Sequence, residues 1–367
     1  MSDVSDLELR HVLVAFRHGD RSPILPKLGR NICMDKAETQ FWGDRLATPE
    51  QVATLDAMAK RAGMGTNDSA PNLAQLIGGK WPNGYLTQLG VEQMISKGQL
   101  LRDEYKEFLG TPSVNDISVR STNVVRTIQS AQCVLLGMFP EFQVKRGESS
   151  IVSIHLHPSC PLSLGHQMDY HHLSTKLKSR RHESPVTDID ALEKEVKSIV
   201  GLDDNEDVQW SFLREILVCR QAHNFPFPKG LTAEMAAKCK LHNGWEWHAH
   251  LSNPNFLRNA FGRGVHEVFG YMKAATQGTS VHKMTILSGH DDTLCGLLHA
   301  FELEQPGIDI LIPEYGSILR FNLLQSKSTG KWFIQAVFDG NDVHFKGTDK
   351  LCPFSHLEAL IQLFPSQ

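Results

Sequence analysis

Residues 9–16 read LRHVLVAF, and residues 17–23 continue directly as RHGDRSP. A short aliphatic run that ends in a polar turn is typical of a buried strand. Two other segments repeat this arrangement: residues 116–119 (DISV) lead into Arg120-Ser121-Thr122, and residues 284–287 (MTIL) lead into Ser288-Gly289-His290-Asp291. The carboxyl ends of strands in open α/β sheets are where ligands bind, so we expect the three polar clusters to lie together.

Helical patterns alternate with these strands. Residues 123–138 and 292–301 carry apolar side chains at helical spacing, and a further long helix is expected to start at the cap residue Thr87. Residues 317–324 and 332–338 flank a polar turn and predict a hairpin. The alternation predicts an α/β fold, with a mixed, mostly parallel sheet and helices on both of its faces.

Two stretches break the alternation. Residues 24–85 contain turns and short helical pieces, and residues 146–270 are rich in His, charge and Pro without clear strands. We interpret both as insertions that form a mainly helical cap and choose the substrate. The catalytic core is then discontinuous, made of residues 8–23, 86–145 and 271–367.

Composition excludes several classes of protein. The 367 residues hold 37 Lys and Arg against 41 Asp and Glu, so a nucleic acid is not implied as a partner. No stretch approaches the ~20 apolar residues of a transmembrane helix. The 18 histidines would make the net charge positive at lysosome-like pH.

The sequence also gives expectations for the state of the cysteines and for the cellular compartment. The seven cysteines are scattered without a C-x-x-C pair and are expected to be free thiols. The sequence MSDVSDLELRHVLVAF shows no signal peptide. We therefore expect a cytoplasmic or organellar protein, and a lysosomal or secreted one only if the N-terminus is processed.

The polar strand ends suggest a specific chemistry. Arg17, His18 and Arg21 fall within five residues. Arginine presents a planar fork that matches phosphate oxygens, and burying two guanidinium groups beside a histidine is unfavourable unless an anion binds them. With Arg120 and the His290-Asp291 pair at the other strand ends, the pattern indicates a site for a dianion with a proton donor beside it.

The R-H-G-x-R-x-P run at residues 17–23, with Arg120-Ser121-Thr122 and His290-Asp291, resembles the signature of the histidine acid phosphatases. The resemblance extends through residues 81–90 (WPNGYLTQLG), 121–137, 221–224 (QAHN) and 351–353 (LCP). Several of these runs are most similar to the lysophosphatidic acid phosphatases of that family. Asp20 departs from that branch and matches the prostatic and lysosomal acid phosphatases instead.

The resemblance implies a role for each residue. His18 would attack phosphorus and become phosphohistidine, and Asp291 would protonate the leaving alkoxide and then assist water. The side chains implied to hold the phosphoryl oxygens are Arg17, Arg21, Arg120 and His290. This scheme needs no metal and no cofactor.

The implied activity is hydrolysis of a small phosphate monoester, with a lysophospholipid as one candidate. A sugar or inositol phosphate is an alternative substrate, and a phosphotransferase or an inactive anion-binding scaffold is an alternative function. A metal site is an alternative for four histidines, but they lack clustered Cys or carboxylate partners, which favours solvated or capping histidines: His155, His157, His171 and His172. His223 could contact the substrate or form a structural hydrogen bond, and the sequence does not decide between the two.

Overall fold

The computed structural model describes residues 6–63, 80–110, 114–140, 152–157, 177–304 and 312–364. Its strands are β1 (Leu7–Arg17), β2 (Lys27–Leu28), β3 (Ile32–Cys33), β4 (Ala59–Gly63), β5 (Ile117–Thr122), β6 (Val152–His157), β7 (Met284–Gly289), β8 (Leu303–Glu304), β9 (Ile318–Ser326), β10 (Trp332–Phe338), β11 (Asn341–Phe345) and β12 (Cys352–Pro353). Its α-helices are α1 (Lys36–Gly43), α2 (Pro49–Met58), α4 (Gln88–Leu109), α5 (Val125–Met138), α7 (Ile189–Val200), α8 (Trp210–Ala222), α9 (Ala233–Leu251), α10 (Pro254–Thr276), α11 (Asp291–Ala300) and α12 (Phe354–Ile361).

One mixed sheet forms the centre of the molecule. Its order is β4-β6-β5-β7-β1-β9-β10-β11-β8, and β12 pairs with β10. Strands β4, β6, β5, β7 and β1 run parallel, whereas the pairs from β1 through β9, β10 and β11 to β8 are antiparallel. The predicted strands, the long helix capped by Thr87 and the late hairpin are all confirmed.

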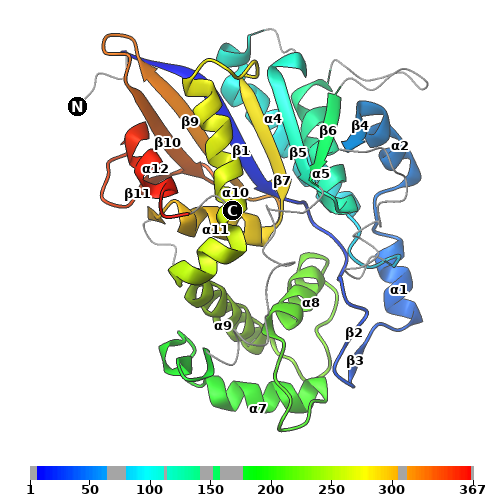
Figure 1. Cartoon of the computed structure of the whole chain (residues 1–367). Coiled ribbons are helices and arrows are strands. Elements are labelled where there is room, and N and C mark those ends of the chain that lie inside the picture. Colours follow the sequence, from blue (N-terminus) through cyan, green and yellow to red (C-terminus); the bar gives the residue numbers. More distant parts are fainter. Residues whose placement is uncertain are drawn as a thin grey trace.

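Helices cover both faces of this sheet, as predicted (Figure 1). Along β1, Val12, Val14 and Phe16 pack into a core with α2, α4 and α5. The alternate residues Leu13 and Ala15 pack into a second core with α10, α11 and α12. Successive side chains of a strand point to opposite faces, so a strand buried on both faces must be apolar at every position.

The cap has a hydrophobic core of its own. Side chains of α7, α8 and α9 pack together, and Leu28 and Ile32 from the short β2–β3 hairpin join them. In Figure 1 these helices lie beside one end of the sheet, beyond the carboxyl ends of β1 and β7. A cap in this position can close over whatever binds at the strand ends.

The predicted boundaries of the cap need correction at three places. Strands β4 and β6 lie within residues assigned to the cap, but they pair in parallel with each other and with β5 in the main sheet. Helix α10 was also assigned to the cap, although its residues Phe261 and Val265 belong to the core against β1. Short strands and a helix that covers a sheet face carry no local signal of which layer they join.

The described chain has no helix that is long and apolar enough to cross a bilayer. Six of the seven cysteines are free thiols, and Cys160 lies outside the described residues. Five of the six are buried.

Strand register brings the three polar clusters together. Arg17 of β1 pairs with Gly289 of β7, and Ser121 of β5 pairs with Ser288 of β7. The segments after these strands therefore leave the sheet at the same edge and level, as the sequence predicted.

Candidate active site

A cavity of about 900 Å³ lies between the carboxyl edge of the sheet and the cap helices α8 and α9. At the sheet end it is lined by Arg17, His18, Arg21, Arg126, Arg214, His290 and Asp291. The remaining wall comes from the cap and is largely apolar. The cavity thus joins one strongly polar end to a wide chamber.

Close backbone packing fixes the turn that carries His18. A Cβ atom on Gly19 would lie 2.6 Å from the carbonyl oxygen of Gly90 in the first turn of α4. A Cβ atom on Gly90 would lie 2.1 Å from the carbonyl oxygen of Asp20. Only glycine permits this approach. The amide of Gly19 donates to Ser130 Oγ on α5 at 3.0 Å, so two helices hold the turn.

The imidazole of His18 is buried and fixed in one tautomer. Its Nδ1 lies 2.8 Å from the carbonyl oxygen of Gly19, which only accepts, so Nδ1 carries the proton and Nε2 keeps its lone pair. Burial, followed by the charges of Arg126 and Arg21, holds the pKa of His18 well below its ordinary value. A neutral ring with a free Nε2 is a nucleophile.

Two guanidinium groups from the same turn are held firmly. Arg17 donates to the carbonyl oxygen of Pro313 at 2.6 Å, and the buried Arg21 forms an ion pair with Glu215 of α8. Both stack near the ring of Tyr315, at 4.2 Å and 5.7 Å from its centroid. These contacts leave the two arginines little freedom and present their charge to the cavity.

Arg126, in the first turn of α5, is the third arginine at the polar end. It is buried, its Nε has no hydrogen-bond partner, and no carboxylate within the described residues forms an ion pair with it. Burial and the charge of Arg21 lower the pKa of Arg126 to about 9. A buried cation without a partner indicates that an anion binds here.

The structure does not bring Arg120 to this cluster, which corrects the prediction. Arg120 lies inside β5 rather than after it, and its Nε lies 2.7 Å from Glu267 Oε1 of α10. Because strand side chains alternate, a residue two positions before the strand end points across a sheet face instead of over the edge. A signal for Arg126 was present: a cation in a helix's first turn opposes the helix dipole unless an anion binds there.

His290 and Asp291 begin α11 at the end of β7. The Nε2 atom of His290 lies 2.9 Å from Thr122 Oγ1 at the end of β5. Its ring centroid is 5.5 Å from that of His18. Burial, followed by the charge of Arg126, holds the pKa of His290 well below its usual range. Both predicted histidines therefore face the same volume in uncharged form.

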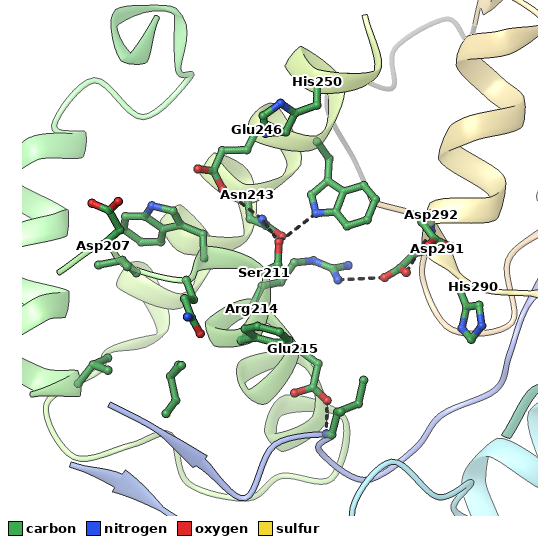
Figure 2. Close-up of a pocket in the computed structure, with 18 of the residues that line it drawn as sticks. Asp207, Ser211, Arg214, Glu215, Asn243, Glu246, His250, His290, Asp291 and Asp292 are labelled. Carbon is green, nitrogen blue, oxygen red and sulfur yellow. Dashed lines mark hydrogen bonds and ion pairs between the residues drawn. The ribbon is translucent and has the colours of Figure 1, made fainter. Parts of the chain in front are cut away.

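Asp291 is the carboxyl group beside this cluster. Its Oδ2 lies 3.1 Å from Arg17 Nη2 and 3.7 Å from Arg214 Nη1 (Figure 2). Burial favours the neutral form of Asp291, but the charges of Arg17 and Arg214 outweigh it and lower its pKa. In the ligand-free site Asp291 is thus an anion held between two arginines.

Arg214 and Tyr315 line or support the site and were not anticipated from the sequence. Arg214 comes from the cap helix α8 and is buried. Whether a cap side chain reaches the catalytic end depends on how the cap docks, which no local pattern records. A weak signal exists on α8, because Ser211, Arg214 and Glu215 share one helix face at spacings of three and four residues.

The other histidines considered in the sequence analysis lie away from the cavity or outside the described residues. His223 Nε2 lies 2.5 Å from Asp20 Oδ2, which also accepts from Thr87 Oγ1 at 2.6 Å, and His223 is not among the residues that line the cavity. His155 is exposed on β6. The side chain of His157, and His171 and His172, lie outside the described residues. Within the described ranges, no three His, Cys, Asp or Glu side chains gather as a metal site would require.

Comparison with known proteins agrees with this geometry. Residues 8–188 match the model of the histidine phosphatase superfamily, branch 2. Counting factor 60 of Dictyostelium discoideum is 27% identical over 95% of this chain and 84% of its own length. Human lysophosphatidic acid phosphatase type 6 is 27% identical over 96% of this chain and 82% of its own length.

Solved structures show the same fold. The structure of the Hafnia alvei phytase in complex with tartrate superposes with a TM-score of 0.64 at 15% identity, covering 99% of this chain and 98% of that one. Together with the signature residues at the strand ends, these matches confirm the resemblance seen in the sequence. Over residues 8–188 the chain is thus similar to the histidine phosphatase superfamily, branch 2.

Proposed function

We propose that the protein hydrolyses phosphate monoesters through a phosphohistidine on His18. One observation carries the proposal: the Nε2 atom of a neutral, buried His18 is free among guanidinium groups that lack a full set of anionic partners. The phosphatase relatives support the same reaction class.

In the first step, Nε2 of His18 attacks phosphorus, an N–P bond forms and the ester P–O bond breaks. Arg17, Arg21 and Arg126 bind the phosphoryl oxygens and stabilise the charge that spreads over them in the transition state. Arg126 takes the role that the sequence had suggested for Arg120. His290 supplies a further uncharged contact.

The proton for the leaving group comes from Asp291. Its pKa is low in the free site because Arg17 and Arg214 face it. A bound phosphoryl group engages Arg17 and adds negative charge beside the carboxyl, and both effects raise the pKa of Asp291. The acid gives its proton to the departing alkoxide, and the resulting carboxylate then takes a proton from the water that attacks phosphorus and releases His18.

The chamber wall supports a leaving group with a substantial apolar part. It includes Leu28, Val208, Phe212 and Phe256. All four arginines of the lining lie at the catalytic end, and the outer wall carries no Lys or Arg among the described residues. A polyphosphorylated inositol would need cations there, so the lining favours monophosphates, among which lysophosphatidate is one candidate, over polyphosphates.

The proposal is tested by steady-state phosphate release from lysophosphatidate, a sugar phosphate, inositol hexakisphosphate and p-nitrophenyl phosphate. We expect turnover of the monophosphates, undiminished by EDTA, and its loss in His18→Ala. His18→Ala enzyme that keeps wild-type turnover, or a chelated enzyme restored only by zinc or magnesium, would contradict the mechanism. Preference for inositol hexakisphosphate would contradict the substrate class.

A further inference from the structure

A second polar cluster lines the cavity beyond Arg214. It consists of Ser211 on α8 with Asn243 and Glu246 on α9, and we call it the acceptor cluster. Ser211 Oγ accepts from Asn243 Nδ2 at 2.9 Å and from Trp247 Nε1 at 3.1 Å. Figure 2 shows the cluster on the far side of Arg214 from Asp291 and His290.

The cluster has hydrogen-bond acceptors that lack donors. Asn243 is 1% exposed, and its Oδ1 has no hydrogen-bond partner. Among the described residues, the polar contacts of the Glu246 carboxyl are Asn243 Nδ2 at 3.4 Å and His242 Nε2 at 3.8 Å. Reversing the amide of Asn243 would exchange the unpaired oxygen for an unpaired Nδ2 and would place Oδ1 beside the carboxyl of Glu246. A donor-rich group is missing from this end of the cavity.

Glu246 also lacks a cation. Among the described residues, no Lys or Arg nitrogen lies within 4.0 Å of its carboxyl, and the nearby Arg181 forms its ion pairs with Glu193 and Asp190. Burial raises the pKa of Glu246 to about 8, which shows that its charge is poorly compensated. Burial also lowers the pKa of His242 to about 4, so this neighbour is uncharged at neutral pH.

Other carboxylates of the outer wall differ from Glu246. Asp207 accepts from Lys178 at 2.6 Å, and Glu206 lies 3.6 Å from Arg30. The negative charges of these two carboxylates are therefore largely neutralised by neighbouring Lys and Arg side chains. The unmet need for positive charge is specific to the acceptor cluster.

Aromatic rings flank this position. Trp210 and Trp247 both line the cavity wall that carries the acceptor cluster. The faces of indole rings attract cations, and the attraction is strongest where water is excluded. An ammonium group offers three donors and one positive charge. It therefore matches an amide oxygen, two indoles and a carboxyl group whose ionised form the cation would stabilise.

We propose that the acceptor cluster binds an ammonium group on the leaving group, so that the preferred substrates are phosphate monoesters of amino alcohols. The inference rests on the proposed phosphatase function and specifies the substrate class of that site. Catalytic arginines bind the phosphoryl dianion at one end, and Glu246 with Asn243 binds the ammonium at the other. Ser211 lies three residues, about 4.5 Å, from Arg214 along the axis of α8, so the substrate needs a spacer between its two charges.

The test compares three series of primary phosphates with two to ten carbons: ω-aminoalkyl, ω-hydroxyalkyl and n-alkyl phosphates. Equal chain lengths keep the reacting centre constant, so kcat/KM reports only the terminal group. We expect the amino series to exceed both others by about tenfold or more over a limited range of lengths. Glu246→Gln should remove that advantage, so that kcat/KM of the amino series falls to the level of the n-alkyl series in the same variant.

Asp207→Asn is the matched control, because it removes a carboxylate of the same wall that already has a lysine partner. It should keep the amino preference. Equal kcat/KM for the amino and n-alkyl series, equal values for the amino and hydroxy series, or an equal loss in both variants would overturn the assignment. Absence of hydrolysis of every phosphate would instead contradict the proposed function, so the two failures are distinguishable.

Discussion

At the scale of single residues, two arginines that lie six positions apart in the sequence have different environments in the structure. Arg126 faces the cavity as a buried cation without a carboxylate partner, whereas Arg120 is held by Glu267 outside it. We expect Arg126→Ala to lower kcat/KM by about 10²-fold or more for every phosphate monoester, because a donor to the transition state is lost.

Arg120→Ala is the control for that substitution. It removes a partly exposed ion pair, worth about 1 kcal/mol or less, and should leave kcat/KM within about threefold of wild type. Among the described residues Arg126 has no carboxylate partner, so its removal leaves none of their buried carboxylates unpaired, and Arg126→Ala should stay folded. A larger loss in Arg120→Ala than in Arg126→Ala would return Arg120 to the phosphate site.

The residue scale also shows what the sequence could predict. The sequence could place five side chains at the sheet edge because each is the last residue of a strand or follows a strand closely: Arg17, His18, Arg21, His290 and Asp291. Arg120 was misplaced because the motif that contains it spans the end of a strand and the start of a helix. The position at which β5 ends determines whether Arg120 or Arg126 reaches the sheet edge. That position is set by the pairing of β5 with β7 and β6.

At the scale of secondary-structure elements, the cap helix α8 reaches into the catalytic chemistry. Arg214 is one of two cations that face Asp291. In Arg214→Gln we expect the pKa of Asp291 to rise. Since the general acid works protonated, the alkaline limb of kcat/KM for alkyl phosphates should move to higher pH by about one unit.

Two comparisons separate this effect from a general disturbance. Arg214→Lys keeps the charge and should restore the wild-type pH profile, and Arg120→Gln should not move it. With p-nitrophenyl phosphate, whose leaving group needs little protonation, the shift should be smaller. A pH profile unchanged in Arg214→Gln would show that Arg214 does not act on Asp291.

A second prediction at this scale concerns Gly90 in the first turn of α4. A methyl group on Gly90 would collide with backbone at Asp20, so Gly90→Ala should destabilise the protein by about 2 kcal/mol or more and disturb the His18 turn. Gly270→Ala, on the exposed face of α10 with nothing within 4 Å, should stabilise it by about 0.5–1 kcal/mol. Urea unfolding measures both, and equal effects would contradict the packing described at Gly90.

At the scale of the whole molecule, buried histidines link stability to pH. His11 and His242 are each 1% exposed, and burial lowers the pKa of each to about 4. The unfolded chain binds protons near pH 6.5, above the folded pKa values, so stability is full above pH 6.5 and falls as the pH drops toward 4.

Each of these histidines should therefore lower the free energy of unfolding by up to ~2 kcal/mol between pH 7 and pH 5. Urea unfolding at both pH values measures the change. His11→Leu should flatten the pH dependence, whereas a substitution of the exposed His155 should not. A free energy of unfolding that rises toward pH 5 would contradict the assignment.

The whole-molecule architecture was largely predictable, but its division into core and cap was not. The strand β1, the helix α5 and the late hairpin are encoded by local hydrophobic periodicity, and the structure contains all three. The short strands β4 and β6 and the helices α2 and α10 join the core only through tertiary contacts. Residues 49–63, 152–157 and 254–270 were therefore assigned to the wrong layer. The approach of α8 to Asp291 was hidden for the same reason.

The most direct test is to trap the phosphoenzyme. Wild type and Asp291→Asn are mixed with an alkyl-linked, ³²P-labelled monoester and with ³²P-labelled p-nitrophenyl phosphate, quenched in alkali within milliseconds, and mapped by peptide. We predict label on the peptide that contains His18, stable in alkali and lost in acid, with Asp291→Asn slowing its formation far more for the alkyl ester than for the phenyl ester. No label at His18, or an acid-stable phosphoserine, would contradict the account.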